Sequence, residues 1–145
     1  MPSQNLNTFR ASHQAFNNRD FDALLKNVRE DVTYHDHARD HTFKGHAGFR
    51  EFLEGWASAF SDAEVTKPRY IDAGNVVIAE FIGRGTNDGP LGPLPETGKR
   101  MNLPFCEVVR FDEQGRIAEC GIYYDQVSLM TQLGHTELPM KAAVG

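Results

Sequence analysis

The hydrophobic pattern of this chain changes once, near residue 60, and that change limits the folds it can adopt. Before it, apolar residues recur every three or four positions, as in amphipathic helices, over residues 6–18, 21–28 and 46–60. After it, four segments with strand-like composition are separated by turn residues: 64–72, 76–86, 100–111 and 116–124. Helices followed by a run of strands predict an α+β domain with an antiparallel sheet.

Cap and turn residues in the sequence predict where several helices, strands and loops begin or end. Asp20 is a suitable N-cap for the second helix. Gly115 supplies the positive φ that a hairpin turn between the last two strands needs. Gly134 ends a last helix over 126–133. Residues 87–99 are rich in proline and glycine, so we expect a loop there rather than a central strand.

The helix over 46–60 carries a heavy aromatic and aliphatic stripe on one face: Phe49, Phe52, Leu53, Trp56 and Phe60. Such a stripe usually packs in a core. Because long, bent strands packed on a helix leave space between the two layers, we expect this helix to close an apolar pocket.

Length and charge narrow the function further. The 145 residues suit a single domain over 1–145, with a core at 6–134 and a tail at 135–145. A net charge of -5 without a basic cluster argues against nucleic acid as a partner. No apolar run approaches the roughly 20 residues that span a membrane, and residues 1–10 lack the apolar core of a signal peptide. We therefore expect a soluble, cytoplasmic protein.

Residues 35–46 gather four histidines and two aspartates. His35 and His37, two positions apart on a strand predicted over 32–37, would share one face, and three such ligands with one open position would make a hydrolytic zinc site. No single regular element can aim all four histidines at one point, however. We expect no metal, and a metal-dependent hydrolase is the weakest of three functional hypotheses.

Three stretches carry recognisable motifs. Residues 85–90 read Gly-Thr-Asn-Asp-Gly-Pro and are followed by Thr-Gly-Lys at 97–99; residues 110–119 hold Arg-Phe-Asp and Gly-Arg-Ile-Ala-Glu; residues 124–126 read Tyr-Asp-Gln. Together, over roughly 6–134, they resemble the SnoaL-like polyketide cyclases of the ester cyclase type. These cyclases often have histidine at the position of Asn87.

The resemblance implies a nuclear transport factor 2-like cone, in which a curved antiparallel sheet packs on three N-terminal helices and encloses an apolar pocket. It also implies a homodimer, no cofactor and a small hydrophobic substrate. It maps Asp125 onto the family's catalytic aspartate, which moves a proton between carbon and oxygen during an intramolecular aldol closure. His35 corresponds to a pocket histidine that assists.

Asp125 and His35 each have a simpler interpretation. Asp125 directly precedes the helix over 126–133 and is a good N-cap, a position that lowers the pKa of a carboxyl. Proton transfer near neutral pH needs the opposite, a pKa raised by apolar surroundings. His35 is equally consistent with a partly exposed histidine on a strand.

Two glutamates interrupt apolar strand segments, Glu80 within 76–86 and Glu107 within 100–111. A carboxylate on the core face of a strand is costly unless it is paired or solvated in a cavity. Each is therefore a pocket acid, a residue on a half-solvated face, or the partner of a nearby arginine. The residues expected to bind substrate are Tyr123, Glu107, Glu80, Phe105, Trp56 and Phe52.

The leading hypothesis is a cofactor-independent enzyme that transfers protons on a hydrophobic carbonyl compound through Asp125, with His35 assisting. Cyclisation, isomerisation and dehydration all belong to this class. The alternative is a non-catalytic domain that holds an apolar ligand, because one fold hosts many functions.

Overall fold

The computed structural model describes residues 3–137, so the expected tail at 135–145 lies mostly outside the described residues. The helices are α1 (Gln4–Asn17), α2 (Phe21–Leu25), α3 (Gly45–Ala59) and α4 (Gln126–Gln132). The strands are β1 (Val28–Asp36), β2 (His41–Lys44), β3 (Glu64–Asp72), β4 (Val76–Thr86), β5 (Arg100–Phe111) and β6 (Ile117–Tyr123). Across residues 3–137, every helix is too short or too polar to traverse a bilayer.

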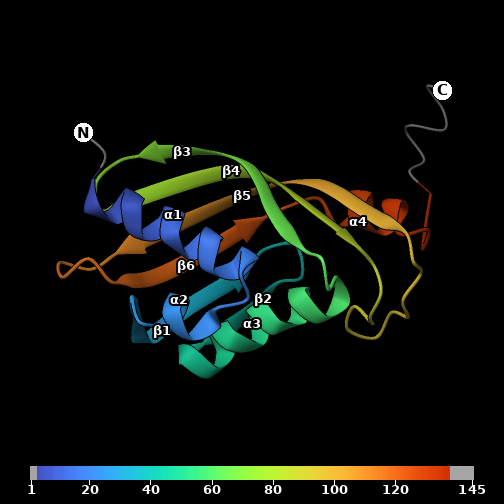
Figure 1. Ribbon diagram of the computed structural model, residues 1–145, viewed down its shortest axis with the longest axis horizontal. Helices are drawn as coiled ribbons and strands as arrows, with labels where there is room; N and C mark the ends of the chain where they lie inside the picture. Colours follow the sequence, from blue (N-terminus) through green and yellow to red (C-terminus); the bar gives the residue numbers. More distant parts are fainter. Residues whose placement is uncertain (1–2, 138–145) are drawn as a thin grey trace.

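All six strands form one sheet in the order β2-β1-β6-β5-β4-β3 (Figure 1). The run from β3 to β6 is the antiparallel meander that the sequence predicts. Strand β1 differs, because it pairs parallel to β6, with Tyr34 opposite Cys120. The sheet is therefore mixed rather than wholly antiparallel. A long connection, which includes α3 and four strands, separates β1 from β6, and such a crossover allows parallel pairing.

Two strand predictions need correction at the N-terminal side of the sheet. Strand β1 begins at Val28, which pairs with Ile117, whereas the sequence predicts a strand only from residue 32. The charged residues after Val28 hide this start. Helix α2 ends at Leu25, whereas the sequence predicts a helix to residue 28. Strand β2 was not predicted, because its four residues carry too little pattern to distinguish it from a loop.

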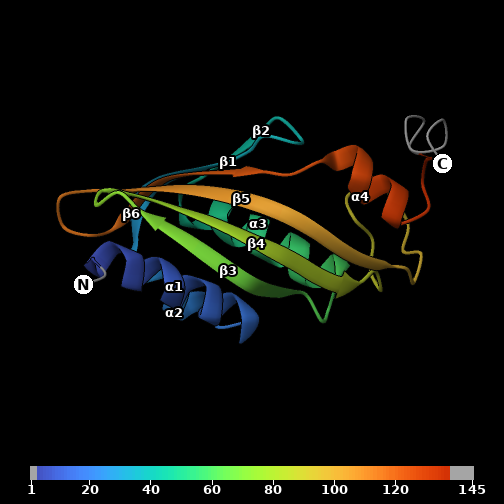
Figure 2. The same ribbon diagram turned by 90° about the horizontal axis from the view of Figure 1, so that it is seen from above.

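Figure 2 shows α1, α2 and α3 on one side of the curved, open sheet. Burial alternates along β5, whose side chains facing these helices are Met101, Leu103, Phe105, Glu107, Val109 and Phe111. The predicted stripe of α3 packs against this inner face. The predicted α+β class is thus confirmed, and the core lies between the helices and the concave side of the sheet.

The predicted turn and cap residues are confirmed. Asp20 accepts a hydrogen bond from the Ala23 backbone N–H as the N-cap of α2. Gly115 has a φ of 77° in the hairpin turn, and Gly134 has a φ of 84° just after α4. Both values lie in the left-handed region, where glycine has no Cβ penalty.

Asn87 organises the loop between β4 and β5 from a fully buried position. Its side-chain nitrogen donates to the Ala59 and Gly89 carbonyls at 3.1 and 2.9 Å. Its side-chain oxygen accepts from the Thr97 N–H at 2.9 Å and from the Thr97 hydroxyl at 3.2 Å. The amide thereby ties the proline-rich loop to the end of α3.

Candidate functional site

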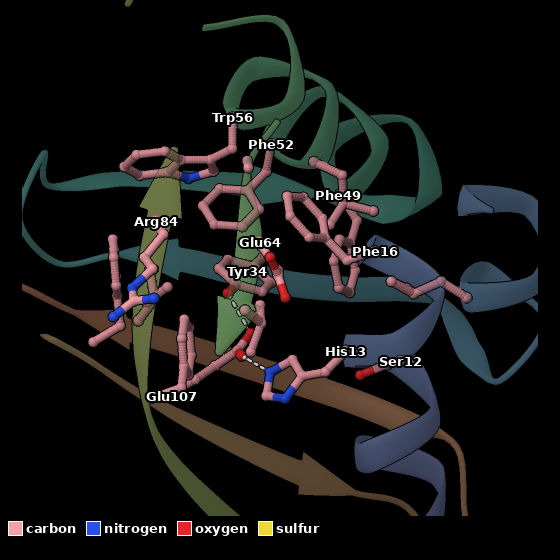
Figure 3. A pocket seen from close by; sticks show the side chains of 18 of the residues that line it. Ser12, His13, Phe16, Tyr34, Phe49, Phe52, Trp56, Glu64, Arg84 and Glu107 are labelled. Atoms are coloured by element: carbon pink, nitrogen blue, oxygen red, sulfur yellow. Dashed lines mark hydrogen bonds and ion pairs between the residues drawn. The ribbon is translucent and has the colours of Figure 1, made fainter. Parts of the chain in front are cut away.

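A cavity of about 80 Å³ lies between the inner face of the sheet and helices α1 and α3. One water needs roughly 10–15 Å³ of such space, so the cavity holds several waters or part of a small organic molecule. Its walls are mostly aromatic and come from both helices and from β4 and β5 (Figure 3): Phe16, Phe49, Phe52, Trp56, Phe81 and Phe105.

Glu107 places a carboxylate in this aromatic cavity. The alternation of β5 turns it inward, and only 8% of the residue is exposed. Its Oε1 lies 2.9 Å from Nε2 of His13, and its Oε2 accepts a hydrogen bond from the Tyr34 hydroxyl (Figure 3). A buried carboxylate is costly without such partners. Each oxygen keeps a lone pair for a further contact.

His13 links Glu107 to a second tyrosine. Its Nδ1 lies 2.8 Å from the hydroxyl of Tyr70. When Nε2–H donates to the carboxylate, Nδ1 of the neutral ring accepts the Tyr70 proton. A chain of four polar groups therefore runs from the fully buried Tyr34 through Glu107 and His13 to the half-buried Tyr70. Four different elements, β1, β5, α1 and β3, supply one member each.

The two phenols are held in their protonated form. Burial raises the pKa of Tyr34 well above its usual value, and the negative charge of Glu107 adds to the effect. Burial raises the pKa of Tyr70 to about 12; Glu107 again adds to the shift and Arg10 opposes it. Both hydroxyls therefore remain hydrogen-bond donors near neutral pH.

A sequence profile of the SnoaL-like domain matches residues 9–120. The chain belongs to the SnoaL-like family. A comparison with curated protein sequences found no match.

Solved structures similar to this SnoaL-like chain support the fold. A candidate polyketide cyclase from Xanthomonas campestris pv. campestris is 24% identical, with a TM-score of 0.80 over 90% of this chain and 96% of that one. A SnoaL-like candidate polyketide cyclase from a Jannaschia species is 17% identical, with a TM-score of 0.83 over 92% and 93%. A protein with a ketosteroid isomerase-like fold from Catenulispora acidiphila, in complex with trimethylamine, is 22% identical, with a TM-score of 0.76 over 90% and 94%.

Asp125 lies outside the aromatic cavity of this SnoaL-like chain. Its carboxylate caps α4 by accepting from the backbone N–H groups of Val127 and Ser128 at 3.0 and 3.2 Å, and from the Ser128 hydroxyl at 2.9 Å. The Ser128 hydrogen bonds lower the pKa of Asp125. Its expected role in proton transfer stays a prediction. The geometry matches the alternative that the sequence offered, a helix cap.

His35 also points away from the cavity, because its neighbour Tyr34 takes the inward position on β1. Its Nδ1 lies 2.7 Å from the Thr42 hydroxyl, and its Nε2 lies 3.5 Å from the Asp40 carboxylate. Within residues 3–137, no hydrogen bond or ion pair joins His35 to Asp125. The structure does not bring the two expected catalytic residues together.

The residues expected to bind substrate divide between the two faces of the sheet. Glu107, Phe105, Trp56 and Phe52 line the aromatic cavity. On the other face, Glu80 pairs with Arg69 at 2.8 Å, and Tyr123 is 47% exposed and stacks on His37. These two border an open groove that also includes Asp125.

The histidine-rich segment spreads its side chains rather than focusing them. His46 donates from Nε2 to the Val28 carbonyl at 2.8 Å, and His41 packs edge-on against Phe43. In the part of the chain that the structure describes, no three histidine, cysteine, aspartate or glutamate side chains are close enough to share a metal ion.

Three members of the cluster, His13, Tyr34 and Tyr70, were not identified as site residues from the sequence. His13 occupies an apolar-stripe position of α1, between Phe9 and Phe16. A histidine on the buried stripe of a helix needs a polar partner in the core, and that need is a usable signal. Tyr34 carries no comparable signal beyond strand parity with Val32.

Proposed function

We propose that this SnoaL-like chain is an enzyme that transfers protons on a small hydrophobic carbonyl compound, with Glu107 as the base and acid. The observation that carries the proposal is the Glu107 carboxylate, buried in an aromatic cavity and held by His13 and Tyr34. A positioned carboxylate in apolar surroundings is well suited to general acid/base catalysis.

The chemistry follows from the free lone pairs of Glu107. The carboxylate removes a proton from the carbon next to a carbonyl, and the electron pair of that C–H bond moves to the carbonyl oxygen as an enolate. The enolate carbon attacks a second carbonyl in the same molecule, and the new alkoxide takes the proton back from Glu107. Return of the proton to a different carbon instead gives isomerisation. Tyr34 and His13 keep the carboxylate in place through these steps.

The proposal is tested by hydrogen–deuterium exchange. The probe is 2-tetralone, a flat apolar ketone, and loss of its α-proton signal in D2O is followed by NMR. We expect the wild-type protein to accelerate exchange and the Glu107→Gln variant to lose about 10²–10⁴-fold of that acceleration, the usual range for one acid/base group. Gln keeps the size of Glu107, and its amide can face both partners if His13 carries its proton on Nδ1 instead of Nε2. The folding of the variant is checked by thermal melting.

If the protein binds 2-tetralone but does not accelerate its α-proton exchange, the alternative is favoured, namely a domain that only holds an apolar ligand. An Asp125→Asn variant is the matched comparison, since it also replaces one carboxylate by its amide. Loss of exchange in Asp125→Asn but not in Glu107→Gln would return the proton-transfer role to Asp125 and contradict our proposal.

We also propose that the chain forms a homodimer through the outer face of the sheet. Ile71 and Tyr123, both on this face, are 54% and 47% exposed, and Val127 at the start of α4 is 48% exposed. Light scattering measures the mass directly, and Tyr123→Lys should shift it toward the monomer. A monomeric wild-type protein would contradict the proposal.

A further inference from the structure

Trp56 carries a buried donor that has no partner. Its side chain is 7% exposed, and its indole nitrogen makes no hydrogen bond to any described residue. Buried polar atoms are paired in the great majority of cases, so each exception asks for an explanation. The indole N–H only donates, so the missing partner is an acceptor.

Packing fixes the direction of this N–H. The indole ring stacks on Phe60 with centroids 6.1 Å apart and meets the Phe105 ring edge-on at 5.7 Å. The Arg39 guanidinium lies 5.7 Å from the indole centroid and is itself held by the buried Asp36 at 2.7 Å. The ring is thus restrained by contacts on several sides. A donor held this way is preorganised for one acceptor position.

Trp56 lines the cavity, and Figure 3 shows the indole nitrogen on the ring edge that faces the other lining side chains. Glu107 comes from the sheet on the other side of the cavity. The Tyr34 hydroxyl already donates to Glu107, and the two ring nitrogens of His13 are hydrogen-bonded to Glu107 and Tyr70. Trp56 is therefore a buried donor of the cavity wall that no described residue satisfies.

We propose that the indole N–H of Trp56 binds a carbonyl-type oxygen of the ligand, and that the ligand is a flat, largely apolar molecule with that oxygen directed away from Glu107. The aromatic walls select the flat apolar body. This inference rests on the proposed function for its catalytic meaning, since the same oxygen gains negative charge when Glu107 removes the adjacent proton. The binding contact itself can be measured without turnover.

The first experiment uses the wild-type protein and a matched pair of probes. Tetralin has the carbon skeleton of 2-tetralone without the oxygen. Because Trp56 is the only tryptophan in the chain, ¹⁵N labelling gives a single indole N–H signal. We expect 2-tetralone to move that proton downfield and slow its exchange with water, and tetralin to do neither while still binding. If 2-tetralone binds and the indole signal does not move, the proposal is overturned. It is also overturned if neither probe shows saturable binding.

The second experiment measures affinity. Trp56→Phe keeps an aromatic wall but removes the donor, so it should weaken the binding of 2-tetralone more than that of tetralin, by about 10-fold or less, the size of one neutral hydrogen bond. Phe52→Leu, which alters a neighbouring wall and removes no hydrogen-bond donor, should weaken the binding of both probes alike. Equal loss for both probes in Trp56→Phe overturns the proposal. If the indole signal shifts but Glu107→Gln keeps full exchange activity, the Trp56 contact stands and the proposed function fails.

Discussion

The imidazole Nε2 of His13 lies 2.9 Å from Oε1 of Glu107, although 94 positions separate the two residues along the chain. Both side chains are nearly buried, with 10% and 11% of their surfaces exposed. The contact joins α1 to the centre of the sheet. It therefore serves the fold and the candidate site together.

This contact predicts an energetic coupling. His13→Phe removes a hydrogen bond to a buried carboxylate, so it should lower the free energy of unfolding by about 1.5–3 kcal/mol. In a Glu107→Gln background the same substitution should cost less, because no charge is left without its partner. Urea unfolding of the four proteins measures the difference. Additive losses would mean that the two groups do not interact.

Asp125 should behave as a cap. Asp125→Asn keeps an acceptor oxygen and should retain exchange of 2-tetralone, whereas Asp125→Ala should lower the melting temperature. The lowered pKa of Asp125 also gives a pH dependence. Its stabilisation is present above the ordinary value of 3.8 and is lost as the pH falls through the folded-state pKa. The melting temperature of Asp125→Asn should lack this acid-dependent component.

Tyr34 should make the fold sensitive to alkali. Its folded-state pKa is raised well above 10.0, so above pH 10 the unfolded chain releases a proton that the folded chain keeps. Stability then falls as pH rises, by up to about 1.4 kcal/mol per pH unit for one such tyrosine. Urea midpoints between pH 8 and pH 11 measure the slope. Tyr34→Phe should reduce this slope, although Tyr70, whose pKa is also raised, keeps part of it, and a matched change at the exposed Tyr123 should leave the slope unchanged.

Gly83 should control the shape of the aromatic cavity. A Cβ at this position would come within 2.5 Å of the Phe105 ring, which lines the cavity and stacks on Phe81. Gly83→Ala should therefore displace the Phe105 ring and lower the affinity for 2-tetralone by roughly 10-fold. This loss is in line with about 1–3 kcal/mol for overpacking.

Gly55→Ala is the matched control. A Cβ there meets nothing within 4 Å on the exposed side of α3. This variant should leave the affinity unchanged and raise stability by about 0.5–1 kcal/mol, because alanine favours a helix over glycine. Unchanged affinity in both variants would place the ligand elsewhere.

Local patterns predicted most of the fold. The stripe from Phe49 to Phe60 depends only on helical spacing, and the positions of Gly115 and Gly134 depend only on backbone conformation. The SnoaL-like motifs added the family and the cone. The parallel pairing of β1 with β6 escaped prediction, because pairing depends on a partner far along the chain.

The candidate site was predicted only in part, and Glu80 and Glu107 show why. Both interrupt apolar strand segments, and alternation says only that neighbouring residues face opposite ways. The outer face of this sheet is itself half apolar, since Ile78 and Ile82 lie beside Glu80 and are half-buried. Helices α1 and α3 cover the other face, and that packing alone buries Glu107 and leaves Glu80 with Arg69.

The sequence by itself determined the helices, the strand meander, the turns and the family, because each follows from spacing within a few neighbouring residues. The tertiary structure decided which carboxylate is enclosed. Along the chain, Asp125 and His35 were the expected catalytic residues, and Glu107 was only a possible pocket acid. Packing of α1 on the sheet brings His13 to Glu107, and the pairing of β1 with β6 brings Tyr34 there. Burial without such partners would be too costly for that charge.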